Sequence, residues 1–290
     1  SNGSYHVAVT NAGGGYSRWR DLAVTRWRED PTRDCWGTFL YLRDTKSGAF
    51  WSAAHQPTLQ RASRYEAIFS QGRAELHRVD GDIETHVEIS VSPEDDIELR
   101  RVTLTNQGRE ARTLELTSYA EVVLAPPAAD TSHPAFSNLF VQTEILRQAQ
   151  AILCTRRPRS GGETPPTLLH VMSAPGAAAG PTSFETAREA FIGRGRTVAN
   201  PLAMSTPTLC DSAGAVLDPI VAVRTSFVIE PAQSVQLHVV TGVAETRELA
   251  LALVDKYRDR HVAARVLELS WTHSQVSLRR LDASDADVHH

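Results

Sequence analysis

The chain has 290 residues, 41% of them hydrophobic and 22% charged, which is typical of a globular protein with one large domain or two ordinary ones. Its formal net charge of −4 argues against a protein that binds nucleic acid through a basic surface. It has no apolar stretch of about 18 residues and no signal peptide at Ser1–Tyr5, so we expect no membrane contact by this chain.

Residues 11–57 are the most distinctive segment, because they hold four of the five tryptophans, six arginines and three consecutive glycines. A Trp ring offers a flat face for stacking on a sugar or base, and Arg offers a planar set of donors for hydroxyl, carboxylate or phosphate groups. The segment therefore indicates recognition rather than a core. The run Gly13–Gly15 predicts either a tight turn or a loop that reaches a sugar or a partner subunit. A nucleotide loop is disfavoured because the Walker and GxGxxG spacings are absent.

The tryptophans have two interpretations, because large aromatic side chains in a sheet sandwich commonly fill the core or cover an edge. For a sugar-stacking surface we favour Tyr16 and Trp19, which lie beside the glycines and Arg18. Trp27 and Trp51 are predicted to be structural.

Alternating apolar residues predict a strand over residues 83–91, a turn at 92–96 and a second strand over 97–105. The apolar positions of the second strand change parity between Leu99 and Val102, which predicts a β-bulge near Arg100 and Arg101. Further strands are expected at 114–124, 138–145, 151–157, 167–173, 219–230 and 233–241. These strands predict a mainly β protein in which two extended antiparallel sheets pack face to face.

From Glu245 the apolar period becomes helical. The first helix has one stripe that consists of Leu249, Ala250, Leu253, Val254 and Tyr257. The second has one face that consists of Val262, Val266, Leu269 and Val276. We see no further element on which these helices can pack, so we expect a chain cut from a longer protein at a linker. The predicted division is a β-domain at 1–243 and a helical linker at 244–290.

Several strings in the sequence carry a resemblance to a known family. They are Asn11–Ser17, Thr25–Arg28, Tyr41–Asp44, Phe50–Ser52, His55–Pro57, Tyr119–Pro127, His133–Phe136, Phe191–Arg196, Val216–Ile220 and Trp271–Ser274. In this order they resemble the N-terminal β-domain of the inverting glycoside phosphorylases, which include cellobiose, chitobiose and 1,2-β-oligoglucan phosphorylases. The resemblance is greatest to the phosphorylase-like region of bacterial cyclic β-1,2-glucan synthases.

The resemblance implies an antiparallel β-supersandwich shaped like galactose mutarotase, followed by linker helices toward an (α/α)6 catalytic barrel outside this chain. It therefore implies a non-catalytic domain without a catalytic residue, cofactor or metal, in a parent enzyme that uses inorganic phosphate as co-substrate. The implied partners are a β-glucan oligosaccharide, the downstream barrel and a second copy of the chain. The implied location is the cytoplasm, or the cytoplasmic face of the bacterial inner membrane.

The candidate residues for contact with carbohydrate or with another domain lie mostly in the N-terminal segment. They are Tyr16, Ser17, Arg18, Trp19, Arg20, Asp21, Arg26, Arg28, His55, Gln56, Arg194 and Arg196. Arg26 and Arg28 flank Trp27, so on a strand both would point away from it. Ordinary surface pairing with nearby carboxylates is the alternative for the arginines.

Catalysis within the chain is not supported by any recognisable pattern. The carboxylates of residues 21–34 form no glycosidase motif, the eleven histidines lack HxH and HExxH spacing, and GxSxG is absent. Cys35, Cys154 and Cys210 lack CxxC spacing, so we expect free buried thiols in a reducing compartment. The alternative functions are an autonomous carbohydrate-binding module and a scaffold or dimerisation domain.

Overall fold

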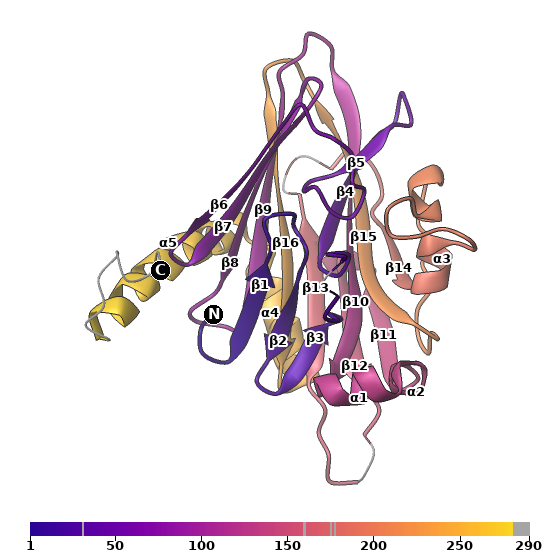
Figure 1. Cartoon of the computed structure of the whole chain (residues 1–290), viewed down its shortest axis with the longest axis vertical. Coiled ribbons are helices and arrows are strands. Elements are labelled where there is room, and N and C mark those ends of the chain that lie inside the picture. The colour runs from indigo at the N-terminus through magenta and orange to yellow at the C-terminus, as the bar shows by residue number, and fades with distance from the viewer. Residues whose placement is uncertain (31, 159–160, 175, 177, 281–290) are drawn as a thin grey trace.

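The computed structural model describes residues 1–30, 32–158, 161–174, 176 and 178–280, and two antiparallel sheets packed face to face make up most of this part (Figure 1). Within these residues each sheet has eight strands. The first sheet contains β1 (Tyr5–Val9), β2 (Gly15–Trp19), β3 (Leu22–Thr25), β4 (Phe39–Asp44), β5 (Phe50–Ser52), β10 (Arg112–Ala125), β14 (Ser183–Ala187) and β15 (Pro219–Ile229). The second contains β6 (Arg64–Ser70), β7 (Arg73–Asp80), β8 (Ile83–Val91), β9 (Ile97–Asn106), β11 (Val141–Leu146), β12 (Ala151–Arg156), β13 (Thr167–Ser173) and β16 (Ser234–Ala244). The predicted pair of extended antiparallel sheets is confirmed.

The helices lie outside this sandwich. They are α1 (Pro127–Ser132), α2 (Pro134–Asn138), α3 (Arg188–Ile192), α4 (Arg247–Tyr257) and α5 (Arg260–Arg280), with 3-10 turns at Arg147–Ala149 and Leu202–Ser205. Among the described helices, none is both long and apolar enough to cross a membrane.

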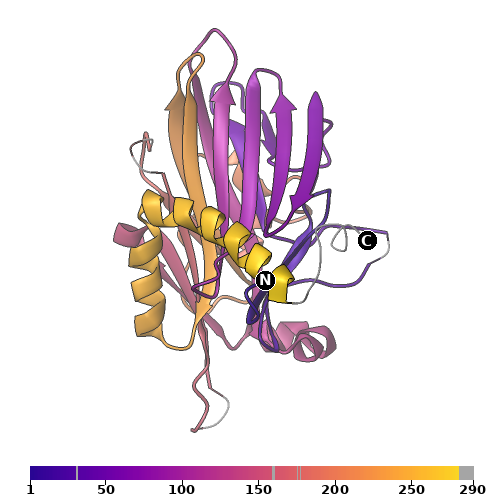
Figure 2. The same ribbon diagram turned by 90° about the vertical axis from the view of Figure 1, so that its left-hand side faces the viewer.

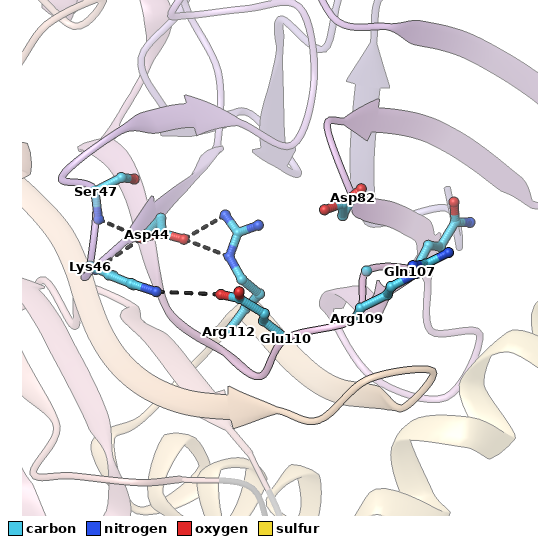
Figure 3. Close-up of a pocket in the computed structure, with 9 residues that line it drawn as sticks. Asp44, Lys46, Ser47, Asp82, Gln107, Arg109, Glu110 and Arg112 are labelled. Carbon is cyan, nitrogen blue, oxygen red and sulfur yellow. Dashed lines mark hydrogen bonds and ion pairs between the residues drawn. The ribbon is translucent and has the colours of Figure 1, made fainter.

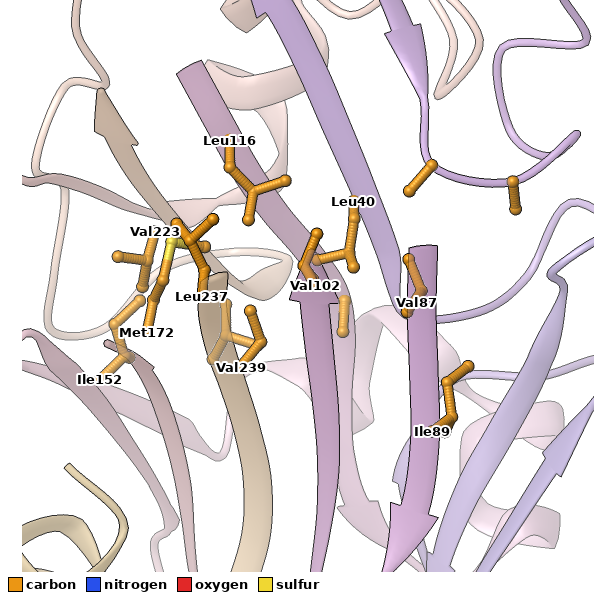
Figure 4. Close-up of a cluster of buried hydrophobic side chains, with 14 of the residues drawn as sticks. Leu40, Val87, Ile89, Val102, Leu116, Ile152, Met172, Val223, Leu237 and Val239 are labelled. Carbon is orange, nitrogen blue, oxygen red and sulfur yellow. The ribbon is translucent and has the colours of Figure 1, made fainter. Parts of the chain in front are cut away.

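The main core fills the space between the two sheets (Figure 4). Val87 and Val102 of the second sheet meet Leu40 and Leu116 of the first, and all four side chains are buried. Burying one such side chain completely contributes roughly 1.5–3 kcal/mol, so this layer is the main source of stability.

The β-bulge predicted near Arg100 and Arg101 is wrong. The register of β9 runs without interruption against both β8 and β16. Ile97 and Leu99 pack toward α4 and α5, whereas Val102 and Leu104 pack into the main core. The apolar positions therefore change parity because different faces of the strand are covered along its length.

Helices α4 and α5 cover part of the outer face of the second sheet (Figure 2). Helix α4 begins after Thr246, whose side chain accepts a hydrogen bond from the Leu249 amide. Buried side chains of both helices join those of the sheet in one cluster that includes Leu169, Val171, Val254, Tyr257 and Val266. These helices therefore pack on the sheet that precedes them in the chain. Leu249 and Val276 are exposed, and residues 281–290 of the predicted linker lie outside the described residues.

The three cysteines are free, as expected. Only Cys154 is fully buried, and burial raises the pKa of its thiol. Cys35 is partly exposed and Cys210 is exposed, so the prediction of buried thiols is wrong for these two.

The buried imidazole of His170 links both sheets. Its Nε2 lies 2.8 Å from Ser118 Oγ on β10, and its Nδ1 lies 2.9 Å from Thr241 Oγ1 on β16. Burial lowers the pKa of His170 to about 3, and the nearby Arg100 guanidinium acts in the same direction. The histidine is therefore neutral in the folded protein over a pH range in which it is protonated in the unfolded chain.

We expect the stability contributed by neutral His170 to be complete above about pH 6.5 and to fall as the pH drops toward 3. The expected slope is about 1.4 kcal/mol for each pH unit, because unfolding takes up one proton. Urea unfolding between these limits measures the slope, and His170→Gln should remove it. An unchanged slope in that variant would contradict the assignment.

Candidate functional site

The three glycines are buried at a tight turn that leads from β1 into β2, and Gly15 is the first residue of β2. The Gly13 amide donates to the Thr10 carbonyl at 3.0 Å, and the Thr10 amide donates to the Gly14 carbonyl at 2.9 Å. An added Cβ at Gly13, Gly14 or Gly15 would overlap Ala54, Asp34 or the Ala8 backbone, respectively. The tight-turn interpretation is therefore confirmed.

Strand β2 sends its side chains alternately inward and outward. Ser17 and Trp19 face the interior, where Ser17 Oγ donates to Glu98 Oε1 and Trp19 Nε1 donates to Asp96 Oδ2, each at 2.6 Å. Trp19 is only 5% exposed. The expectation that Trp19 offers an open stacking face is wrong, because the period of two along the strand turns it away from Tyr16 and Arg18.

Tyr16, which is partly exposed, and Trp27, which is exposed, form an aromatic pair instead. Their ring centroids lie 5.5 Å apart with the planes inclined at 52°. Trp27 is 45% exposed, so its predicted structural role is wrong, whereas Trp51 is buried as predicted. The two rings line a cleft of about 230 Å³, which we call the Tyr16–Trp27 cleft. Its lining residues are Tyr16, Ser17, Arg18, Ala23, Thr25, Trp27 and Pro127.

A buried group of charged and polar side chains, which we call the Arg26 cluster, adjoins this cleft. It consists of Arg26, Glu121, Asp130, Asn138, Arg188 and Asp218. Arg26 comes directly after β3 and is 5% exposed, so the geometry considered for a strand does not apply to it. Its Nη1 contacts Glu121 Oε2 at 2.6 Å and Asp218 Oδ1 at 3.1 Å. Its Nη2 donates to Asn138 Oδ1 at 2.7 Å and lies 3.3 Å from Asp130 Oδ1.

The electrostatics of the Arg26 cluster keep Arg26 and Glu121 charged. Burial alone would raise the pKa of Glu121, but the guanidinium groups of Arg26 and Arg188 outweigh burial and hold it below the ordinary value. Burial would likewise lower the pKa of Arg26, and the surrounding carboxylates raise it instead. A carboxyl group with a lowered pKa is a poor proton donor, so Glu121 is unsuited to act as a general acid.

The candidates Arg28, Arg18 and Arg20 each pair with a different carboxylate. Arg28 lies 3.5 Å from Asp130 Oδ2, at the edge of the Arg26 cluster. Arg18 pairs with exposed Asp21 at 3.3 Å, as the alternative of pairing with nearby carboxylates predicted, whereas Arg20 pairs with the distant Glu245 at 2.7 Å.

Of the twelve candidates only Tyr16, Ser17 and Arg18 line the Tyr16–Trp27 cleft, and the last four candidates also lie outside it. His55 and Gln56 lie beside the glycine turn, where the Gln56 amide donates to the Ala12 carbonyl at 2.8 Å. Arg194 and Arg196 are exposed after α3.

The sequence interpretation missed the partners of Arg26. Glu121 and Asp218 lie within two of the strings that carry the family resemblance, Tyr119–Pro127 and Val216–Ile220. Those strings were the signal that could have found them. The separation of 192 residues between Arg26 and Asp218 hides the contact from any local pattern.

A larger hollow of about 790 Å³ lies among the turns that follow β4, β7 and β9 (Figure 3). Asp44 accepts hydrogen bonds from Arg112 Nε at 2.8 Å and from the amides of Lys46 and Ser47. Lys46 Nζ also lies 3.4 Å from Glu110 Oε2. These groups satisfy one another and the lining contains no aromatic ring, so we assign the candidate site to the Tyr16–Trp27 cleft.

Comparisons with known proteins agree on one family. The family profile described as "Glycosyl hydrolase 94, supersandwich domain" matches residues 1–260. Cyclic beta-(1,2)-glucan synthase NdvB of Rhizobium meliloti (strain 1021) is 39% identical over 289 residues, which cover 99% of this chain and 10% of that protein. Solabiose phosphorylase of Paenibacillus borealis is 26% identical over 75% of this chain and 27% of that enzyme. The chain thus spans a small part of the relatives that it matches.

Solved structures are similar in fold at low sequence identity. A bacterial glucoamylase complexed with acarbose has a TM-score of 0.54 and 9% identity, over 93% of this chain and 35% of that chain. A polysaccharide lyase has a TM-score of 0.50 and 15% identity, over 87% of this chain and 34% of that chain.

Proposed function

This chain belongs to the family of glycosyl hydrolase 94 supersandwich domains, and from that premise we propose that it is the non-catalytic β-domain of a glycoside phosphorylase module. Membership of the family confirms the resemblance and the β-supersandwich fold expected from the sequence. In the proposed role the Tyr16–Trp27 cleft lines part of a β-glucan site. The parent enzyme would be a cyclic β-1,2-glucan synthase at the cytoplasmic face of a bacterial membrane, with inorganic phosphate as co-substrate.

The observation that carries this proposal is that the aromatic pair of Tyr16 and Trp27 lies beside the Arg26 cluster. Sugar rings stack on exposed aromatic faces, and Arg18 beside Tyr16 supplies donors for hydroxyl groups. The Arg26 cluster fixes the chain on one side of Trp27 by ion pairs to α1, β10 and the residue before β15. Such support favours a preformed binding surface.

Exposed apolar side chains around the same end of the sandwich support a contact with the downstream barrel or with a second copy. Phe136 and Leu139 flank the cluster residue Asn138, and Leu217 precedes the cluster residue Asp218. All three side chains are exposed, as is Trp27. Exposed apolar groups that gather in one region are typical of an interaction surface.

The described residues that line the cleft include no carboxyl group and no imidazole, which supports a non-catalytic role. Glu121, Asp130 and Asp218 each form ion pairs with Arg26, and none of the three lines the cleft. We therefore expect little or no release of glucose 1-phosphate when this chain alone is incubated with linear β-1,2-glucan and inorganic phosphate. Turnover comparable to that of an intact phosphorylase would refute the proposal.

Autonomous carbohydrate binding is a second candidate function, and the exposure of Trp27 favours it. We expect calorimetric titration with β-1,2-glucooligosaccharides to show weak binding that Trp27→Ala reduces about tenfold, because one aromatic contact contributes about 1.5 kcal/mol. Trp271→Ala, which removes an exposed indole on α5 outside the cleft, is the matched control and should leave the affinity unchanged. The absence of heat at high ligand concentration would exclude this second function.

A further inference from the structure

Two histidines and a glutamate meet on the outer face of the second sheet. The register of β7 and β8 places His77 directly opposite His86. Glu75 lies two residues before His77 and therefore projects from the same face of β7. The side chains are partly buried and converge on one point of the surface.

The ligand atoms of these side chains lie close enough to share an ion. The imidazole rings stack with centroids 3.9 Å apart and planes inclined at 17°. His86 Nε2 lies 2.9 Å and His77 Nε2 3.7 Å from the same oxygen, Glu75 Oε2. One atom from each of the three residues can be chosen so that all lie within 4.8 Å of one another. A tetrahedral zinc ion with bonds of about 2.0–2.1 Å to two nitrogens holds them roughly 3.3 Å apart. The two rings must tilt out of their stacked arrangement to bind it, because each nitrogen lone pair lies in the plane of its ring.

The second oxygen of Glu75 is already engaged. Arg73 Nε lies 3.1 Å from Glu75 Oε1, and Arg73 Nη1 lies 3.0 Å from Glu88 Oε1. Glu88 in turn pairs with Arg101. This chain of contacts orients the Glu75 carboxylate and leaves Oε2 facing the imidazoles, which is the kind of outer support that metal-binding carboxylates commonly receive.

The charge around the three residues is compatible with a divalent cation. Glu66 is opposite His77 on β6, and Glu88 is opposite Glu75 on β8, while Arg73 and Arg101 balance Glu88. Imidazole nitrogen with one carboxylate suits zinc and its neighbours in the transition series, whereas calcium and magnesium prefer oxygen ligands only.

We propose that Glu75, His77 and His86 bind a zinc-class divalent ion that bridges β7 and β8. The ion replaces the proton between His86 and Glu75, and its fourth coordination position is open to water or an external ligand. The proposal is independent of the sugar-binding role, because these residues lie on the second sheet and the Tyr16–Trp27 cleft lies on the first. The sequence did not reveal it, because residues 77 and 86 become neighbours only through the register of the hairpin.

Zinc titration by calorimetry tests the proposal. Each protein that is titrated also carries His289→Ala and His290→Ala, because two adjacent histidines bind zinc themselves. We expect one zinc ion per chain, and a loss of affinity of about 100-fold or more in His86→Ala and in His77→Ala. His273→Ala makes the same change at an exposed position of α5 and should leave zinc binding intact. Cobalt should give the visible absorption of a low-symmetry four-coordinate site, and His86→Ala should remove it.

Two results would overturn the proposal. One is the absence of saturable zinc binding in the reference protein, in which only His289 and His290 are replaced by alanine. The other is unchanged affinity in the folded His86→Ala protein, as judged by its melting temperature. If an alanine variant does not fold, Glu75→Gln takes its place, because it keeps the side-chain shape and removes the charged ligand. Unchanged zinc affinity in folded Glu75→Gln would also overturn the proposal.

Discussion

Replacing Arg26 with alanine is expected to lower the free energy of unfolding by about 3–5 kcal/mol, since it leaves buried carboxylates without their counter-ion. Glu121 and Asp130 are themselves buried, and Arg26 contacts both as well as Asp218. Urea denaturation measures the loss. Arg64→Ala is the matched control, because Arg64 forms an exposed ion pair with Glu66, and removing such a pair changes stability by at most about 1 kcal/mol.

The Arg26 variant should also change the pH dependence of stability. The pKa of Glu121 is held below its ordinary value of 4.5, so its contribution is complete above that value and is lost as the pH falls through the lowered folded-state pKa. Without Arg26 the acid side of the stability profile should become flatter. Equal losses in Arg26→Ala and Arg64→Ala would show that the Arg26 cluster is not a structural support.

Replacing Gly15 with alanine is expected to cost about 3 kcal/mol or more, and so to disrupt the turn that positions β2. Gly15 has a φ of +143°, and an added Cβ would overlap the carbonyl of Ala8 on the paired strand. Both backbone strain and overlap with fixed backbone atoms contribute to the cost. The melting temperature and urea midpoint measure it.

Gly161→Ala is the control for this prediction, because an added Cβ at Gly161 meets no atom within 4 Å. We expect that change to alter stability by no more than about 0.5 kcal/mol. Because Tyr16 follows Gly15 directly, the Gly15 variant should also weaken any sugar binding in the Tyr16–Trp27 cleft. A Gly15→Ala protein as stable as Gly161→Ala would contradict the tight packing of this turn.

Local patterns in the sequence were sufficient for several elements after residue 82 and for the family. The alternation over residues 83–91 and the helical period after Glu245 correspond to β8 and α4, because side-chain direction within one strand or helix depends only on nearby residues. The ordered strings identified the family without knowledge of any contact.

Tertiary structure decided which face of each element is covered. The two-residue period of β2 separates Tyr16 from Trp19, but only packing against the second sheet shows that Trp19 is the buried one. Likewise, the parity change in β9 has its cause in helices more than 140 residues later in the chain. The roles of Trp19 and Trp27 were interchanged for this reason.

The Arg26 cluster and the proposed zinc site show the same difference between local sequence pattern and tertiary contact. The sequence by itself determined a β-supersandwich with an aromatic, arginine-rich N-terminal segment. Only the fold buried Arg26 among carboxylates up to 192 residues away and brought His77 opposite His86. A side chain's partner depends on strand pairing and on the cover of each sheet face, and both are properties of the whole chain rather than of neighbouring residues.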